Sequence, residues 1–209
     1  MSRDWVAWHD AYDDPSSRLS RRLAVVQRYL TVALDAQQPG PIRIVSMCAG
    51  QGRDVIGALR THDRRDHVRA RLVEIDPTLA AGARDAAARA GFQRVEVVCA
   101  DASVTTPYAG LVPANVVVAC GIFGNITPED IQHTVSELPR LCAADAWVVW
   151  TRHPRDPALI DDIHSWFEAG GFVSHEWEQE DDTFGVGLHR FGGEPLPFVA
   201  GRRLFTFAT

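Results

Sequence analysis

Paired cysteines, long apolar runs and a concentrated basic region are all missing from this 209-residue sequence. The cysteines are Cys48, Cys99, Cys120 and Cys142, and no two of them form a C-x-x-C pair. We therefore predict buried free thiols, with neither a disulfide nor a metal centre. No apolar run approaches the ~18 residues that a membrane-spanning helix needs, and the polar N-terminus is unlike a signal peptide. These absences predict a cytoplasmic protein without a membrane partner.

Lysine is also absent, so arginine alone supplies the 21 cationic residues, against 27 acidic ones and a net charge of −6. Because no basic stripe stands out, nucleic acid is a poor first candidate as a partner. The 46% hydrophobic and 23% charged fractions are those of an ordinary globular protein. The length fits one domain spanning residues 1–209. The sequence leaves the oligomeric state open.

Residues 42–54 have the pattern of a ligand-binding turn. A β-branched run that ends at Val45 predicts a buried strand. Small residues follow, with Gly50 and Gly52 among them, and they allow a tight turn and a close approach of a ligand to the backbone. Apolar residues then resume at helical spacing. A strand, a glycine turn and the unpaired N–H groups of a helix N-terminus together predict a cradle for a ligand.

Five apolar runs alternate with helical patterns along the chain, and a hairpin pattern follows them. Such alternation predicts a parallel sheet with helices on both faces, to which the hairpin adds antiparallel strands. The predicted fold class is α/β, a three-layer sandwich with a mostly parallel sheet and a closing antiparallel hairpin. We expect strands that begin at residue 42 and lie near residues 69–75, 94–99, 115–120 and 146–150, the hairpin at 172–178 and 184–189, and a last short strand at 204–207.

In an open α/β sheet, a ligand lies beyond the carboxyl ends of the strands. Glu74 ends the second strand, where its two oxygens can accept hydrogen bonds from both hydroxyls of a ribose. Asp101 follows the third strand and can accept one from the amino group of adenine. Asp76, just before Pro77, is expected to cap the next helix. Val55 stands where a dinucleotide-binding turn has its third small residue, so the pattern favours adenosine with an amino-acid tail.

This arrangement resembles the class I S-adenosylmethionine-dependent methyltransferases over residues 42–190. That family follows its first strand with an acidic residue and a G-x-G-x-G motif. Here residues 46–52 read Ser-Met-Cys-Ala-Gly-Gln-Gly. The last two glycines match, whereas Ser46 stands for the acid and Cys48 for the first glycine. The resemblance implies a Rossmann-like fold in which residues 42–190 form the cofactor-binding core.

The resemblance also implies S-adenosyl-L-methionine as the cofactor. Glu74 matches the family's ribose-binding acid, and Asp101 matches the acid that touches adenine. Carboxylates that would bind Mg²⁺ are missing from the ends of the fourth and fifth strands, so no metal is expected. The expected cofactor-binding residues are Ala49, Gly50, Gln51, Gly52, Glu74, Ile75, Asp101, Ala102, Cys120 and Gly121.

Methyl transfer requires alignment of the acceptor and, where the nucleophile carries a proton, a base. His153 is the main candidate base, because it follows the fifth strand and titrates near neutral pH; a surface histidine is the alternative. His9 is the second candidate catalytic residue, and it shares a predicted helical face with aromatic residues. The N-terminal helices within residues 1–36 could form a lid over the acceptor, or the aromatic face could pack on the sheet edge. The expected acceptor-binding residues are Trp5, Trp8, Tyr12, Asn125 and Arg152, the last of which would hold a carboxylate or phosphate.

Three functions remain open at this point. The acidic charge and the aromatic N-terminus favour O- or N-methylation of a small-molecule acceptor, such as a secondary metabolite. A basic face shared by the arginines of residues 18–28 and 60–71 would favour an RNA or protein methyltransferase. The changes at Ser46 and Cys48 leave a non-catalytic S-adenosylmethionine-binding protein as the third alternative.

Overall fold

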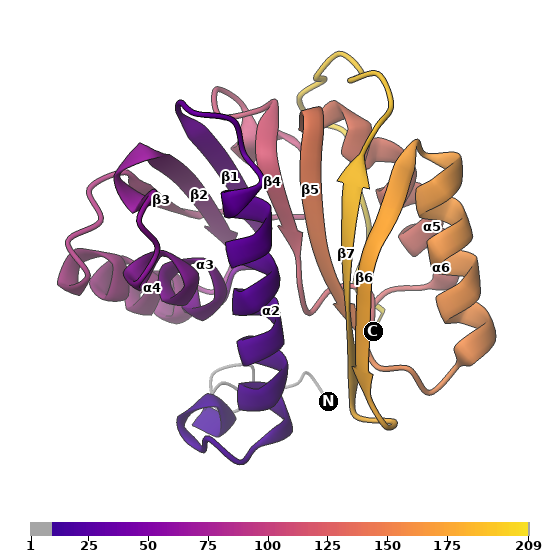
Figure 1. Ribbon diagram of the computed structural model, residues 1–209, viewed down its shortest axis with the longest axis horizontal. Coiled ribbons are helices and arrows are strands. Elements are labelled where there is room, and N and C mark those ends of the chain that lie inside the picture. The colour runs from indigo at the N-terminus through magenta and orange to yellow at the C-terminus, as the bar shows by residue number, and fades with distance from the viewer. Residues whose placement is uncertain (1–9, 209) are drawn as a thin grey trace.

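The computed structural model describes residues 10–208 as a three-layer α/β sandwich (Figure 1). Its middle layer is a seven-stranded sheet in the order β3-β2-β1-β4-β5-β7-β6. Strands β1 to β5 run parallel, and β7 lies antiparallel between β5 and β6. The predicted fold class is thereby confirmed. The strands are β1 (Ile42–Met47), β2 (Val68–Glu74), β3 (Val95–Cys99), β4 (Ala114–Ala119), β5 (Cys142–Arg152), β6 (Phe172–Glu180) and β7 (Phe184–Phe191).

Helices cover both faces of this sheet. Those on one face are α2 (Arg18–Asp35), α3 (Arg53–Arg60) and α4 (Pro77–Arg89), and those on the other are α5 (Pro128–Glu137) and α6 (Pro157–Ala169). Short 3₁₀ helices are η1 (Asp10–Asp13), η2 (Arg65–His67), η3 (Thr106–Tyr108) and η4 (Leu138–Arg140). Within residues 10–208, no helix is both long and apolar enough to cross a lipid bilayer.

The sheet separates two apolar cores. Side chains alternate between the faces of a strand, so Ile44 of β1 packs in the core under α2 and α3, whereas Val45 packs in the core under α5 and α6. Trp150 of β5 is fully buried in the second core. Its indole Nε1 donates a hydrogen bond of 3.0 Å to Nδ1 of His189 on β7, which fixes the hairpin against the parallel part of the sheet.

Helix α2 has a clear start and two contrasting faces. Ser17 caps it, and its hydroxyl oxygen accepts a hydrogen bond from the backbone N–H of Ser20 at 3.1 Å. Leu30 and Leu34 lie on its buried face, while Arg18 at its first turn is exposed. The N-terminal end of α2 therefore carries arginine side chains.

The two ends of the chain depart from the predicted elements or lie partly outside the described residues. The short strand expected at residues 204–207 is wrong: apart from an isolated bridge between Val104 and Arg203, the tail there is irregular. A loop and side chains of α5 satisfy its backbone instead: the Leu204 N–H donates to the Ser103 carbonyl oxygen at 2.7 Å, and the Leu204 carbonyl oxygen accepts from the Thr134 hydroxyl at 2.9 Å. The helix expected at residues 4–12 lies outside the described residues up to position 9, and the rest belongs to η1.

Candidate functional site

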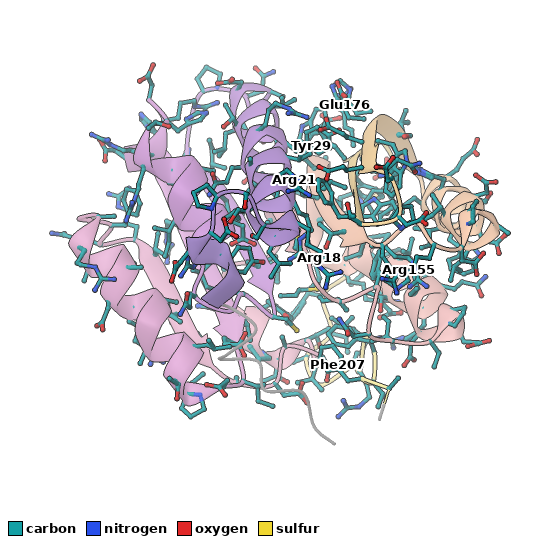
Figure 2. The ribbon with its side chains drawn as sticks, turned by 90° about the horizontal axis from the view of Figure 1, so that it is seen from below. Arg18, Arg21, Tyr29, Arg155, Glu176 and Phe207 are labelled. Atoms are coloured by element: carbon teal, nitrogen blue, oxygen red, sulfur yellow. The ribbon has the colours of Figure 1, made fainter. Side chains whose placement is uncertain are left out.

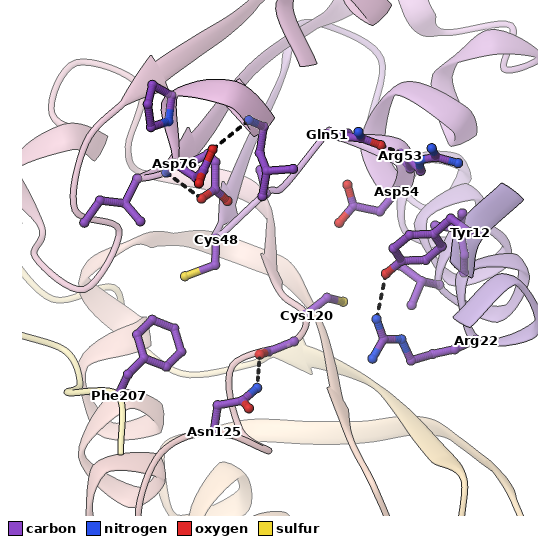
Figure 3. Close-up of a pocket in the computed structure, with 18 residues that line it drawn as sticks. Tyr12, Arg22, Cys48, Gln51, Arg53, Asp54, Asp76, Cys120, Asn125 and Phe207 are labelled. Atoms are coloured by element: carbon purple, nitrogen blue, oxygen red, sulfur yellow. Dashed lines mark hydrogen bonds between the residues drawn. The ribbon is translucent and has the colours of Figure 1, made fainter. Parts of the chain in front are cut away.

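A cavity of about 470 Å³ opens at the carboxyl ends of β1, β2 and β4 (Figure 3). Its volume is in the range of small-molecule sites. The turn after β1 and the loop after β4 form its floor, while η1, α2 and Phe207 of the C-terminal tail contribute its remaining walls. The lining residues are Tyr12, Arg22, Leu23, Val26, Cys48, Ala49, Gln51, Arg53, Asp54, Glu74, Ile75, Asp76, Pro77, Leu79, Cys120, Gly121, Asn125 and Phe207.

The turn after β1 owes its shape to residues with positive φ angles. Gly50 has a φ of 55° and Gly52 one of 68°, a left-handed region that glycine enters without steric cost. A Cβ atom on Gly52 would lie only 2.7 Å from Cδ1 of Leu72. Cys48 also has a positive φ, of 50°. The chain therefore keeps a left-handed residue where the methyltransferase motif has its first glycine, but with a side chain that lines the cavity.

Glu74 connects the turn to the end of β2. Its side chain is buried, at 7% exposure, and its two oxygens accept hydrogen bonds from the backbone N–H groups of Gly50 at 2.7 Å and Asp76 at 2.9 Å. A carboxylate has about four acceptor positions on its two oxygens. Glu74 therefore holds the turn in place and still presents acceptor positions to the cavity that it lines.

The residues after Glu74 have separate roles. Asp76 caps α4 by accepting hydrogen bonds from the backbone N–H groups of Thr78 at 2.8 Å and Leu79 at 3.0 Å, as the sequence predicts. Ile75 lines the cavity and is 65% exposed. An exposed isoleucine at the mouth of a cavity gives an apolar surface on which a flat ring can pack.

Asp54 and Arg22 bring opposite charges to the cavity, and the sequence analysis did not identify either as a site residue. Asp54 stands in the first turn of α3, where burial raises its pKa to about 6 although Arg22 acts to lower it. The guanidinium of Arg22 donates a hydrogen bond of 2.7 Å to the phenol oxygen of Tyr12 (Figure 3). A carboxyl group two residues after Gly52 was a usable signal; Arg22 had none beyond its place on a polar helix face.

Asp101 lies beside the cavity and not on its wall. Its Oδ1 accepts hydrogen bonds from the backbone N–H of Ser103 at 2.8 Å and from the Ser103 hydroxyl at 2.5 Å. The Nη1 atom of Arg203, in the C-terminal tail, lies 3.7 Å from Oδ2 of Asp101. Burial acts to raise the pKa of Asp101, but the Ser103 hydrogen bonds and Arg203 bring it below its usual value. Ala102, which follows it, is buried in the core.

The loop after β4 borders the cavity and contacts Arg152. Asn125 lines the cavity and donates a hydrogen bond of 2.8 Å to the carbonyl oxygen of Gly121, so it also closes the loop. Arg152 donates to the carbonyl oxygen of Phe123 in the same loop. Neither Arg152 nor His153 lines the cavity itself; both lie behind residues 121–125.

His153 lies in a cationic environment. Burial lowers its pKa, and the neighbouring Arg152, Arg155 and Arg18 lower it further. Its Nδ1 atom is buried and has no hydrogen-bond partner among the described residues. The imidazole is therefore neutral at pH 7 and able to accept a proton.

Other predicted site residues have mixed placements. Ala49, Gln51, Cys120 and Gly121 line the cavity together with Tyr12, whereas Gly50 and Gly52 shape the turn without lining it. Trp5, Trp8 and His9 lie outside the described residues. In the part of the chain that the structure describes, no cluster of three or more His, Cys, Asp or Glu side chains could hold a metal ion.

The cysteines depart in part from the buried thiols that the sequence predicts. Cys142 is buried, Cys48 and Cys120 are half-buried on the cavity wall, and Cys99 is exposed, so the prediction is wrong for Cys99. All four are free. Burial raises the pKa of the Cys48 and Cys120 thiols.

Several solved structures with the same architecture are methyltransferases. A magnesium protoporphyrin IX methyltransferase from Synechocystis with bound S-adenosylhomocysteine has a TM-score of 0.66 at 12% identity, covering 90% of this chain and 93% of its own. An RNA methyltransferase from Salinibacter ruber in complex with S-adenosylhomocysteine has a TM-score of 0.55 at 23% identity, covering 86% and 97%. A precorrin-6y C5,15-methyltransferase from Geobacter metallireducens has a TM-score of 0.59 at 13% identity, covering 82% and 87%.

The chain has the class I methyltransferase fold. The sequence matches no protein-family model and no curated protein. In this methyltransferase fold, the strand order reverses between β1 and β4, because β2 lies on one side of them and β5 on the other. Ligands of open α/β sheets bind at such a reversal. The cavity opens at this reversal, between the turn after β1 and the loop after β4.

Proposed function

We propose that this protein is an S-adenosylmethionine-dependent methyltransferase that O- or N-methylates a small-molecule acceptor. The observation that carries the proposal is Glu74. It is a buried carboxylate at the end of β2, bonded to the glycine turn and open to a cavity at the strand-order reversal. The fold, which the chain shares with solved methyltransferases, supports the same activity.

The side of the cavity near β2 and β3 fits adenosine. Glu74 would accept hydrogen bonds from the ribose hydroxyls, and the exposed side chain of Ile75 would pack against the adenine ring. Asp101 would accept a hydrogen bond from the adenine amino group through its Oδ2, because Ser103 occupies Oδ1, and the Ser103 hydrogen bonds together with Arg203 keep the pKa of the carboxyl low.

The side near α2 and α3 fits the amino-acid portion of the cofactor. That portion carries an ammonium and a carboxylate, and the cavity offers Asp54 and Arg22 as their counter-charges. Asp54 would take the place of the acid that the family has at position 46, where Ser46 is fully buried and its hydroxyl lacks a partner among the described residues. Tyr12 would hold Arg22 in position through its hydrogen bond.

S-adenosylmethionine, when bound, would supply a methyl group on a cationic sulfur. The chain's own contribution is alignment of the acceptor and removal of its proton. Arg152 and Asn125 fix the loop of residues 121–125 that borders the cavity. His153 lies behind this loop as a neutral imidazole, so it would accept the proton from the acceptor's hydroxyl or amine.

Calorimetry with S-adenosylhomocysteine tests the proposal. We expect micromolar binding to the wild-type protein and a loss of at least about a hundredfold for Glu74→Ala, because both ribose contacts disappear. Glu74→Gln, which keeps one acceptor oxygen for the turn, separates ribose binding from support of the turn.

Glu194→Ala serves as the control, because Glu194 is exposed and does not line the cavity, and this substitution removes the same charge. Its affinity should equal that of the wild type. Absence of binding by the wild-type protein to both S-adenosylmethionine and S-adenosylhomocysteine would refute the proposed function.

A further inference from the structure

Two arginines that have no partner among the described residues lie close enough to His153 to act on its charge. Arg18 stands at the start of α2, and Arg155 stands in the loop between β5 and α6. Both act on the His153 imidazole, together with Arg152. Figure 2 shows Arg18 on α2 and Arg155 on the neighbouring loop, with Arg21 farther along the helix. Elements distant in sequence thus bring the charges of three guanidinium groups near enough to act on one imidazole.

Arg18 and Arg155 differ from other arginines on the same surface in having no partner. Arg21 is paired with Glu180 at 2.6 Å, and Arg28 is paired with Glu178. Within residues 10–208, neither Arg18 nor Arg155 has an ion pair or a hydrogen bond, and both are exposed. Their guanidinium donors are therefore available to a ligand.

The two other charged groups at this place are already engaged. Arg152 donates to the carbonyl oxygen of Phe123, so part of its guanidinium is engaged in holding the loop. Asp156 faces Arg152 and accepts a hydrogen bond from the backbone N–H of Leu159 at 3.2 Å as the cap of α6. No acid in the described chain neutralises Arg18 or Arg155, in a protein whose net charge is −6.

We propose that the methyl acceptor carries a carboxylate or phosphate group, and that Arg18 and Arg155 bind this group while the acceptor's nucleophile faces His153. Arginine suits the task, because its planar fork of donors matches both anions. The inference rests on the proposed function, since it assigns the substrate class of the same site. Arg22 lies on the cavity and serves the cofactor, so the two anionic groups have separate arginines.

The test uses small aromatic anions on the protein saturated with S-adenosylhomocysteine at low ionic strength. Benzoate and phenyl phosphate are the probes, and benzamide is the neutral analogue of the same size. Nuclear magnetic resonance of the His153 imidazole, assigned by its loss in His153→Ala, reports binding at this place. We expect a saturable shift with at least one anion and none with benzamide, and comparison of the two anions tells carboxylate from phosphate.

The double variant Arg18→Ala/Arg155→Ala should weaken anion binding by at least about tenfold. The control, Arg69→Ala/Arg89→Ala, removes two exposed arginines that do not line the cavity, and it should bind like the wild type. No saturable shift with either anion, or an equal loss in the control, would overturn the inference.

Two further outcomes would assign the arginines elsewhere. Displacement of S-adenosylhomocysteine by the anions would place the cluster in the cofactor site. Submicromolar binding of a 20-nucleotide RNA that the double variant loses would make nucleic acid the ligand. Cofactor binding is measured separately by calorimetry. If the protein does not bind S-adenosylhomocysteine, the anions are titrated on the ligand-free protein. A negative result for the proposed function can then be told from a negative result for the anion site.

Discussion

Asp54 is a carboxyl group in an environment that disfavours its charge. Burial raises its pKa to about 6, well above that of an unfolded chain, and Arg22 offsets only part of this effect. The folded protein therefore binds a proton more readily than the unfolded one, and the ionised form costs stability at pH values above 6. A side chain that costs stability at physiological pH is expected where it serves a ligand.

Asp54→Asn should raise the free energy of unfolding at pH 8 by about 1–2 kcal/mol, because it removes the cost of a buried charge. The same variant should bind S-adenosylhomocysteine at least about tenfold more weakly, since the ammonium loses its counter-charge. Urea unfolding at pH 8 and calorimetry measure the two effects.

Asp85→Asn is the matched control, because Asp85 is exposed on α4. It should change neither quantity. For the wild type, affinity should fall as pH decreases through 6, whereas Asp54→Asn should show no such decrease. A variant that gains stability and keeps full affinity would remove Asp54 from the cofactor site.

His153→Ala should lower kcat by about 10²-fold or more if the imidazole is the base, and it should leave the dissociation constant for S-adenosylhomocysteine unchanged. Because burial and three arginines lower the pKa of His153 below its ordinary value of 6.5, the acidic limb of the kcat profile should lie below pH 6.5. Single-turnover kinetics across pH measure this limb.

His67→Ala is the control, because it removes an exposed imidazole in η2, and it should behave as the wild type. An unchanged kcat in His153→Ala would exclude the role of His153 as the base.

At the scale of elements, the junction of β1 with α3 determines the cavity floor. Gly52 is the N-cap residue of α3 and has a left-handed backbone. An alanine there would be strained by its φ angle and would press its Cβ on Leu72 and Ile56. The helix start, and with it Asp54, depends on this one glycine.

Gly52→Ala should therefore lower the free energy of unfolding by about 2 kcal/mol or more, and cofactor affinity should fall with it. Chemical denaturation followed by circular dichroism measures the change. Gly82→Ala is the control, because Gly82 lies within α4 and its added Cβ would meet Gln51 at an ordinary 3.6 Å. That variant should gain up to about 1 kcal/mol from helix propensity, and an equal loss in both variants would contradict the steric explanation.

Patterns within single elements made the sheet and the turn predictable. The apolar runs predicted β1 to β5, the hairpin pattern predicted β6 and β7, and the Asp76-Pro77 pair predicted the start of α4, because burial and capping follow from local sequence. The expected strand at residues 204–207 failed, since Leu204 and Phe205 are buried in the core beside α5 and α6 without pairing with a strand of the described sheet. A tail that completes no sheet leaves no periodic signal in the sequence.

At the scale of the whole molecule, ligand binding should raise thermal stability. S-adenosylhomocysteine at 100 times its dissociation constant would add about 2.7 kcal/mol to the folded state. For a chain of this size, that corresponds to an increase in Tm of about 5–10 °C. Scanning calorimetry measures it, with Glu74→Ala expected to show little increase at the same ligand concentration. An unchanged wild-type Tm would contradict binding to the folded state.

Sequence reasoning missed four charged groups, and the reason is geometric. Arg22 comes from the helix that precedes β1 in the sequence and Asp54 from the helix that follows it. Arg18 and Arg155 are 137 positions apart. Each looks like a solvated surface residue in its own segment. Glu74 was found because its position at a strand end is itself the signal, whereas convergence of separate segments is a tertiary property.

The cavity wall carries two thiols, from Cys48 and Cys120. Methyltransferase turns with glycine at the first of these positions have no side chain there, so Cys48 is a chemical handle particular to this chain. Burial keeps both thiols protonated and slow to react with reagents in solution. An adenosine analogue with a mild electrophile would hold that group against the sulfur and form a covalent adduct, detectable by mass spectrometry. Such a compound would inhibit this protein and spare methyltransferases whose turns carry glycine.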